Sequence, residues 1–244
     1  MAGETIDGTY RQTNLPNESK EYLAKREEIR LAEIELRNLR EKVAELRRQL
    51  PPGAILQDYE FIEGPASLDD GDTPTRKVRL SELFTAQDRS LVIYQMMYGK
   101  KQTTPCPMCT AWLDSWNGVA HHLAQNIDVA VVAAADVPTL RAHARTRGWD
   151  KLRLLSAGES TFKYDLGSED AEGNQDSTIS VFTRDKDGTL RHFYSVHPRL
   201  SEDMDTRGID EWNPIWNILD MTPQGRGSFD ASLDYGTKVQ AARH

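Results

Sequence analysis

The feature that most constrains the fold of this chain is a pair of cysteines, two residues apart, that follows an apolar segment. Residues 91–98 (LVIYQMMY) are apolar and β-prone, and a short loop joins them to Cys106 and Cys109. Helical periodicity begins at the cysteines, and Pro107 suits the first helical position because its missing N–H would have no intrahelical partner there. The order therefore predicts a buried strand, a loop, and a helix that starts at the two cysteines.

The place of Cys106 predicts a reactive thiol. The first turn of a helix has unpaired N–H groups and the positive end of the helix dipole, and both stabilise a thiolate. The thiolate is the nucleophile in disulfide exchange. Cys109, one turn later, is expected close enough to close a disulfide or to resolve a mixed one. The chain has only these two cysteines, whereas the disulfides of secreted proteins usually join distant segments.

Composition argues against several classes of protein. No apolar run approaches the ~20 residues that span a bilayer, and the first residues lack the basic and apolar regions of a signal peptide. The net charge is −8, which argues against nucleic acid because phosphate binding needs a basic face. We therefore expect a cytoplasmic protein that binds neither membranes nor nucleic acids.

A long heptad pattern occupies residues 17–50. Its apolar positions are Ile29, Leu36, Val43 and Leu50 in one set and Ala32, Leu39 and Leu46 in the other. A helix of this length extends about 50 Å, at 1.5 Å per residue, and the prolines at 51 and 52 end it. The helix either binds a partner or folds back along its own domain, with a homodimer through residues 17–50 slightly favoured.

The remaining segments alternate between strand and helix patterns. Strands are expected at 59–63, 91–97, 127–134, 152–155, 178–183 and 189–195, with a short strand and turn at 77–84. Helices are expected after the cysteines, at 136–148 and from 213. This order predicts an α/β fold, a thioredoxin-like three-layer sandwich with a mixed central sheet plus a long N-terminal helix. The expected parts are a disordered 1–16, the helix 17–52, the thioredoxin-like domain 54–222 and a mobile tail 223–244.

Three alternatives to redox exchange stay open at the cysteines. Buried free cysteines are often inert. A zinc site would need His121 and His122, which lie ~18 Å along the helix, so one helix cannot bring all four side chains to one ion. Thr103 stands three residues before Cys106, the offset at which peroxiredoxins place a Thr or Ser beside their peroxidatic cysteine. Gly99, however, stands where their motif has proline, and an ordinary loop role for Thr103 is the simpler interpretation.

Several segments resemble those of one family. They are the heptad helix ending in Leu-Pro and residues 61–65, 78–84, 91–99, 106–114, 162–167 and 216–227. Together they resemble the bacterial thioredoxin-like family of unknown function described as predicted dithiol–disulfide oxidoreductases. The likeness covers about residues 17–227. It implies the fold, suggests Cys106 and Cys109 as a redox pair, and supplies no established substrate.

These observations predict a thiol–disulfide oxidoreductase without metal or organic cofactor. Cys106 is the expected attacking thiolate and Cys109 the resolving thiol. Thioredoxins carry a cis-proline before the C-terminal hairpin, but residues 175–179 contain no proline. A small-molecule disulfide or one dedicated partner is therefore as plausible as a general protein substrate. The rivals are a non-catalytic binding or assembly module acting through the N-terminal helix and a peroxiredoxin-like thiol peroxidase.

Overall fold

The computed structural model describes residues 15–202 and 207–234 of the chain. The segments expected to be disordered or mobile, 1–16 and 223–244, lie partly outside these residues. The chain divides into two compact units, Met1–Pro51 and Pro52–His244. We describe each unit by itself.

The first unit consists of one long helix, α1 (Lys20–Arg48, 29 residues), as the heptad pattern predicts. Ser19 caps its start, because the Ser19 side chain accepts a hydrogen bond of 3.1 Å from the Tyr22 N–H. Ion pairs within the unit support it, among them Arg26 with Glu18 at 2.7 Å. None of the residues of α1 is buried.

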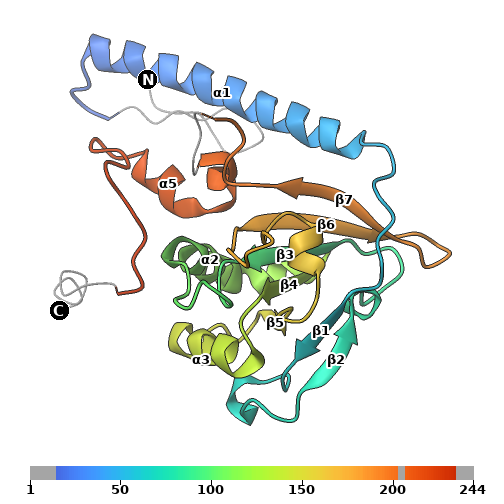
Figure 1. Cartoon of the computed structure of the whole chain (residues 1–244). Coiled ribbons are helices and arrows are strands. Elements are labelled where there is room, and N and C mark those ends of the chain that lie inside the picture. The colour runs from blue at the N-terminus through green and yellow to red at the C-terminus, as the bar shows by residue number, and fades with distance from the viewer. Residues whose placement is uncertain (1–14, 203–206, 235–244) are drawn as a thin grey trace. The chain divides into compact units, whose positions relative to one another are not determined.

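The second unit is a mixed sheet with short and long helices (Figure 1). Its strands are β1 (Glu60–Glu63), β2 (Arg76–Arg79), β3 (Leu91–Met96), β4 (Asp128–Ala133), β5 (Arg153–Ser156), β6 (Thr178–Arg184) and β7 (Leu190–Val196). Its helices are α2 (Pro107–Leu123), α3 (Val137–Arg147), α4 (Phe162–Asp165) and α5 (Pro214–Leu219), with 3₁₀ turns η1 (Leu68–Asp70), η2 (Leu80–Leu83) and η3 (Arg207–Trp212). Within the described residues the strand order is β2-β1-β5-β4-β3-β6-β7.

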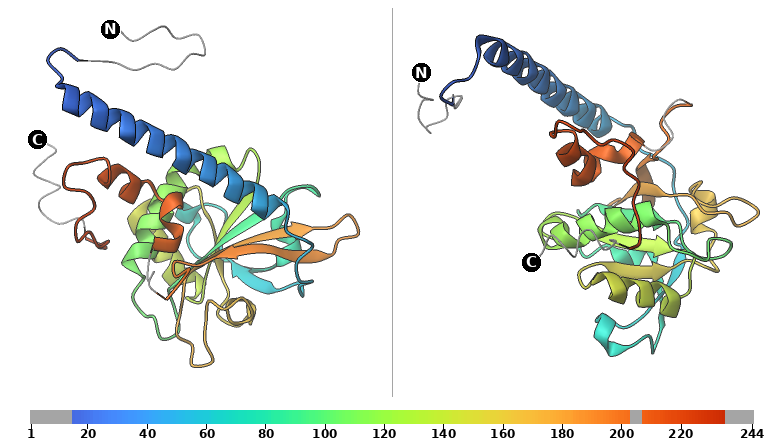
Figure 2. Two further views of the ribbon diagram at one scale, coloured as in Figure 1. Left: turned by 90° about the horizontal axis from the view of Figure 1, so that it is seen from above. Right: turned by 90° about the vertical axis from the view of Figure 1, so that its left-hand side faces the viewer.

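The sheet is parallel in its centre and antiparallel toward both edges. Strands β3, β4 and β5 run parallel, while β1 on one side and β6–β7 on the other are antiparallel to their neighbours. The hairpin β6–β7 forms one edge of the sheet and is seen from two further directions in Figure 2. The predicted α/β class with a mixed sheet is confirmed.

The two faces of the sheet carry different layers. Crossovers between parallel strands are right-handed, so the successive steps β3 to β4 to β5 place α2 and α3 on the same face. Trp112 of α2, Leu140 of α3 and Trp216 of α5 pack in one hydrophobic core, the first core. The other hydrophobic core, the second core, contains Leu80 from η2 and Phe162 from α4. The third layer is thus made of short helical turns.

Strand β3 contributes side chains to both cores. Its side chains alternate, so that Leu91 and Ile93 join the second core while Tyr94 and Met96 join the first. All but one of its six residues are buried, as expected for a central strand covered on both faces.

The short strand and turn expected at residues 77–84 are both present. Arg76–Arg79 pairs with β1. Leu80–Leu83 form a 3₁₀ turn, and this turn directs both Leu80 and Leu83 into the second core. The apolar alternation is therefore satisfied by a helical turn and not by a longer strand.

Candidate functional site: a thiol pair at the start of helix α2

Cys106 is the N-cap residue of α2. Its backbone is extended (φ −63°, ψ 124°), and its sulfur accepts a hydrogen bond of 3.4 Å from the Cys109 N–H. The Cys106 N–H donates to the Met97 carbonyl at 3.2 Å, which ties the cap to the end of β3. The sulfur therefore takes the position in which capping oxygens normally bind the unpaired N–H groups of a helix.

The loop between β3 and the cysteines depends on Gly99. Its φ is +105°, and a Cβ atom there would lie 2.0 Å from the backbone nitrogen of Ala135. The neighbouring Tyr98 carbonyl accepts a hydrogen bond from that same nitrogen at 2.9 Å. Proline, fixed near φ −65°, cannot occupy this position. The backbone conformation of this loop therefore excludes proline at position 99.

The two thiols have unlike surroundings. Both are free, and Cys106 is partly exposed whereas Cys109 is 1% exposed. The hydrogen bond from the Cys109 thiol lowers the pKa of Cys106 to about 6; the N–H groups of Cys109 and Met108 add to this, and burial and the charge of Asp230 oppose it. The same hydrogen bond, together with burial, raises the pKa of Cys109. The pKa values of the two sulfurs are therefore shifted in opposite directions, downward for the partly exposed Cys106 and upward for the buried Cys109.

Two buried polar side chains lie close to Cys109. Burial raises the pKa of Tyr94, and the neighbouring Cys109 raises it further. Lys163, from α4, is 1% exposed, and its Nζ donates to the carbonyls of Met96 (3.3 Å) and Asp176 (3.5 Å). Burial lowers the pKa of Lys163 to about 8, while the charge on Cys109 acts in the opposite direction.

Sequence reasoning does not single out Lys163. Lysine is rarely buried, so a lysine beside a phenylalanine in a short segment is normally assigned to the surface. The only available signal is its place in the 162–167 segment that carries part of the family resemblance.

His143, from α3, is a second residue without a sequence signal. Its Nε2 lies 3.0 Å from the Thr110 hydroxyl, which itself donates to the Cys106 carbonyl at 3.0 Å. Its ring packs edge-on against Tyr98 and Trp149. Burial lowers the pKa of His143. This chain of contacts supports the backbone of the first turn of α2.

Comparison with known families supports one part of the sequence resemblance, a bacterial family of unknown function. One family model, described as "Bacterial protein of unknown function (DUF899)", matches residues 12–241. The chain belongs to this family. No curated protein matches the chain.

Solved structures with a similar fold include redox proteins. Reduced Prx3 in complex with h2o2 from Vibrio vulnificus is 17% identical, covering 66% of this chain and 94% of that chain at a TM-score of 0.44. A mutant of Xylella fastidiosa PrxQ is 14% identical, with 70% and 96% covered and a TM-score of 0.45. A putative thioredoxin reductase from Burkholderia cenocepacia is 19% identical, with 59% and 87% covered and a TM-score of 0.43. None of the chemistry below depends on these likenesses.

Thr103, the third expected site residue, lies exposed in the loop before Cys106. Among the described contacts its hydroxyl makes no hydrogen bond, either to Cys106 or to another group. Its role stays a prediction. Trp112 and Trp116, expected in the core, are 1% and 8% exposed and lie there.

The histidines considered for zinc are exposed on α2, with ring centroids 4.0 Å apart. In the part of the chain that the structure describes, no three His, Cys, Asp or Glu side chains gather closely enough to hold a metal ion. Nor does any helix there have the length and apolar character needed to cross a bilayer.

The C-terminal segment of the described chain borders the cysteine site. Asn213 donates to the Ala111 carbonyl of α2 at 3.3 Å, and Trp216 packs on Trp112 with ring centroids 5.7 Å apart. Further on, the charge of Asp230 acts on Cys106. Residues beyond the last helix thus contribute to the surroundings of the nucleophile.

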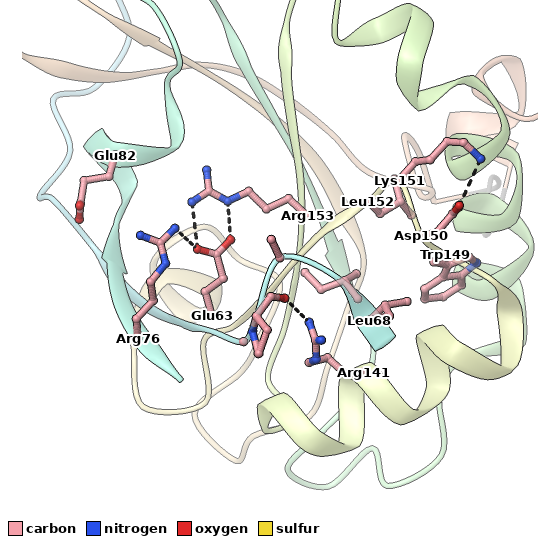
Figure 3. A pocket seen from close by; sticks show the side chains of 14 residues that line it. Glu63, Leu68, Arg76, Glu82, Arg141, Trp149, Asp150, Lys151, Leu152 and Arg153 are labelled. Atoms are coloured by element: carbon pink, nitrogen blue, oxygen red, sulfur yellow. Dashed lines mark hydrogen bonds and ion pairs between the residues drawn. The ribbon is translucent and has the colours of Figure 1, made fainter. Parts of the chain in front are cut away.

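A hollow of about 500 Å³ lies away from the cysteines, at the β1–β5 side of the sheet (Figure 3). Neither cysteine lines it. Glu63 in its wall pairs with Arg76 (2.6 Å) and Arg153 (2.6 Å), and Arg141 donates to backbone carbonyls, including that of Pro65 at 2.7 Å. Because these charged groups bind one another and the backbone, we assign the hollow no chemistry.

Proposed function

We propose that the protein is a thiol–disulfide oxidoreductase with Cys106 as nucleophile and Cys109 as resolving thiol. The observation that carries the proposal is the contrast between the two sulfurs. Cys106 is partly exposed and caps a helix, and its pKa of about 6 makes it largely thiolate at neutral pH. Cys109 lies one turn behind it, buried and within hydrogen-bonding reach.

The reaction consists of two exchanges. The Cys106 thiolate attacks one sulfur of a substrate disulfide R–S–S–R′, forms the mixed disulfide Cys106–S–S–R and releases R′S⁻. Cys109 then loses its proton and attacks the Cys106 sulfur, which forms the intramolecular disulfide and releases RS⁻. Two electrons pass from the cysteine pair to the substrate, and an external dithiol returns the pair to the reduced state.

The substrate we propose is a small-molecule disulfide or one dedicated protein partner. The loop before β6, which in thioredoxins presents a cis-proline to an extended chain, has no proline here. Serine and aspartate occupy it, and the Asp176 carbonyl there accepts a hydrogen bond from the buried Lys163. We place the reaction in the cytoplasm, where thiols are kept reduced.

Cysteine variants test this function directly. Cys106→Ser should lose reductase activity toward a small aromatic disulfide, whereas Cys109→Ser should complete the first exchange and accumulate a mixed disulfide. Mass spectrometry of Cys109→Ser recovered from a lysate would identify the trapped partner. Full activity in Cys106→Ser would rule out the nucleophile assignment.

A thiol peroxidase is the second candidate, favoured by the low pKa of Cys106 and the sequence offset of Thr103. Here the thiolate attacks a peroxide oxygen, the O–O bond breaks, and sulfenate and water or an alcohol result. Hydrogen peroxide should then add one oxygen to Cys106 in Cys109→Ser at a rate well above that of free cysteine. A rate equal to that of free cysteine would leave only the exchange reaction.

A further inference from the structure

Lys163 is a buried cation without an ion pair. Its side chain is 1% exposed, and within the described residues its ammonium donates hydrogen bonds to two backbone carbonyls alone, those of Met96 and Asp176. Over the residues that the structure describes, no carboxylate lies within ion-pair distance of its Nζ; the nearby Glu169 pairs with Lys100 instead. An unpaired buried ammonium destabilises a fold, so a lysine here calls for a further explanation.

One peptide group separates Lys163 from Cys109. The Lys163 ammonium donates to the Met96 carbonyl, and the N–H of the same peptide, that of Met97, interacts with the Cys109 sulfur. The C=O and the N–H of a trans peptide point in opposite directions. The ammonium and the sulfur therefore lie on opposite sides of the Met96–Met97 peptide. A cation on the carbonyl polarises the peptide and makes its N–H a stronger donor.

The second exchange needs such a charge. In the reduced pair, the Cys106 thiolate accepts the Cys109 proton in a hydrogen bond. Once Cys106 is bound to substrate, this acceptor no longer carries a charge, and Cys109 must ionise in a buried place. Burial disfavours a thiolate, and a nearby cation favours it.

We infer that Lys163 is a positioning residue for the second exchange, in which its ammonium, acting through the Met96–Met97 peptide, stabilises the Cys109 thiolate. The inference rests on the proposed function. In this step a bond forms between the sulfurs of Cys109 and Cys106, and the bond from Cys106 to the substrate sulfur breaks. The electron pair of the broken bond leaves on the substrate sulfur, and the Cys109 proton passes to the departing RS⁻.

Two variants separate charge from hydrogen bonding. Lys163→Met removes both, and Lys163→Gln keeps an N–H donor for the two carbonyls. In single-turnover reactions of the reduced protein with an asymmetric aromatic disulfide, release of the first thiol reports the first exchange and release of the second reports resolution. Both variants should slow the second release at least tenfold at pH 7 and leave the first within about twofold. Lys100→Met, which removes a more exposed cation of the same region, should change neither.

The pH profile of resolution gives a further readout. In both Lys163 variants the midpoint for the second release should move to higher pH than in the wild type. The charged and titratable groups around Lys163 and Cys109, which are Tyr94, Lys100, Cys106, Glu169 and Asp176, keep their identity in both Lys163 variants. A Lys163→Gln variant that resolves at the wild-type rate and pH would overturn the inference and leave the proposed function intact. A wild type that releases neither thiol would overturn the proposed function itself.

An independent observation concerns the apolar stripe of α1. Its heptad side chains are uncovered, with Ile29 53%, Leu36 49%, Leu39 57% and Leu46 55% exposed. A strict 3.5-residue spacing of such side chains is typical of a coiled-coil seam. The question is which helix covers this seam.

The charges beside the seam favour a second copy of α1 in antiparallel orientation. With Leu36 opposite Leu39 of a second copy, Glu35 faces Lys42 and Glu33 faces Arg40, each twice by symmetry, and only Arg26 opposite Arg47 repels. In a parallel pair, Glu35–Arg40 and Glu21–Arg26 attract while Glu28–Glu33 and Lys42–Arg47 repel. The antiparallel pair thus has twice as many attractive as repulsive contacts, and the parallel pair has equal numbers. The geometry points to a homodimer through antiparallel α1 helices.

Charge reversal tests both the dimer and its orientation. Sedimentation equilibrium of the full chain at low salt should give a dimer that Leu39→Glu dissociates. Lys42→Glu should weaken the antiparallel dimer several-fold, and Glu35→Lys combined with Lys42→Glu should restore it. In a parallel dimer, Lys42→Glu would strengthen association, because it removes the contact with Arg47. Tighter association of Lys42→Glu, or a monomeric wild type at all concentrations, would overturn this second inference.

Discussion

At the residue scale, the two thiols differ because each occupies a different end of one hydrogen bond. Cys106 accepts from the thiol and the N–H of Cys109, so ionisation gains two partners. The Cys109 thiol donates this hydrogen bond and is buried, so its ionisation would break the hydrogen bond to Cys106 and leave a charge without solvation by water. The pKa values of two identical side chains three residues apart are therefore shifted in opposite directions. The cause is their position, Cys106 at the cap and Cys109 in the first turn of α2.

The pH dependence of alkylation should report the Cys106 thiolate. The folded-state pKa of Cys106 is about 6, below the ~8.5 of a free cysteine, so reactivity is lost only as the pH falls through 6. The rate of alkylation by iodoacetamide should be half-maximal near pH 6 and level above pH 7. Mass spectrometry of quenched samples should find the label on Cys106 and not on Cys109. A midpoint at pH 8 or above would contradict the capping geometry.

Substituting the donor should shift this profile. Cys109→Ala removes the thiol that stabilises the Cys106 thiolate, so the alkylation midpoint should move toward the free value by about one pH unit, since one such hydrogen bond contributes about 1–2 kcal/mol and one pKa unit equals about 1.4 kcal/mol. Cys109→Ser keeps a donor and is the matched control, with a smaller shift. Equal midpoints in the two variants would assign the low pKa to the helix terminus alone.

At the element scale, the strand-loop-helix unit that carries the site is local in sequence, and it is well predicted from sequence for that reason. Pro107 at the first turn of α2, Asn213 as the cap of α5 and Gly148 with φ +67° after α3 all occupy the positions that their chemistry favours. Helix α2 and the β6–β7 hairpin accordingly fall within a residue or two of their expected bounds.

What sequence could not predict depends on contacts between distant segments. The pairing of β1 with both β2 and β5 has no local signal. Lys163 lies 54 positions after Cys109 in the numbering, and its burial depends on the Met96 and Asp176 carbonyls, which neither periodicity nor propensity can bring together. The contact of His143 with Thr110 has the same origin. The position of the two cysteines at the start of α2 could therefore be predicted, and the buried groups near Cys109 could not.

A glycine substitution should test the loop that positions this unit. Gly99→Ala combines φ +105° with a Cβ placed 2.0 Å from the Ala135 nitrogen, so the loop must move, and we expect a loss of about 3 kcal/mol or more in the free energy of unfolding. Gly188→Ala is the control, because its φ is +91° but a Cβ there meets nothing within 4 Å. It should lose only about 1–2 kcal/mol. Urea unfolding compares the two, and equal losses would show that the contact with Ala135 is unimportant.

At the scale of the whole molecule, the site lowers the stability of the fold that holds it. Lys163 is buried at 1% exposure without an ion pair among the described residues, although a methionine would fill the same space without a charge. Active sites commonly contain such destabilising groups. Variants at this position should therefore gain stability as they lose the second exchange, which is the opposite of what a structural lysine would show.

The pH dependence of the free energy of unfolding should reveal how much the buried Lys163 ammonium destabilises the fold. The folded-state pKa of Lys163 is about 8, below the ordinary lysine pKa of 10.5, so the unfolded chain binds more protons between these values and the stability of the wild type rises with pH there. The destabilisation by the buried ammonium is fully present below about pH 8 and amounts to about 3 kcal/mol, from 2.5 pKa units at about 1.4 kcal/mol each.

Lys163→Met removes this destabilisation, but the hydrogen bonds lost with the ammonium offset about 1 kcal/mol of the gain. At pH 7 this variant should be roughly 2 kcal/mol more stable than the wild type in urea unfolding, and the difference should shrink and then reverse as the pH approaches 10.5. The difference between the two proteins therefore reports Lys163 together with the groups whose charge it interacts with, Cys109 among them. A variant less stable at pH 7 would mean that the ammonium holds the fold together.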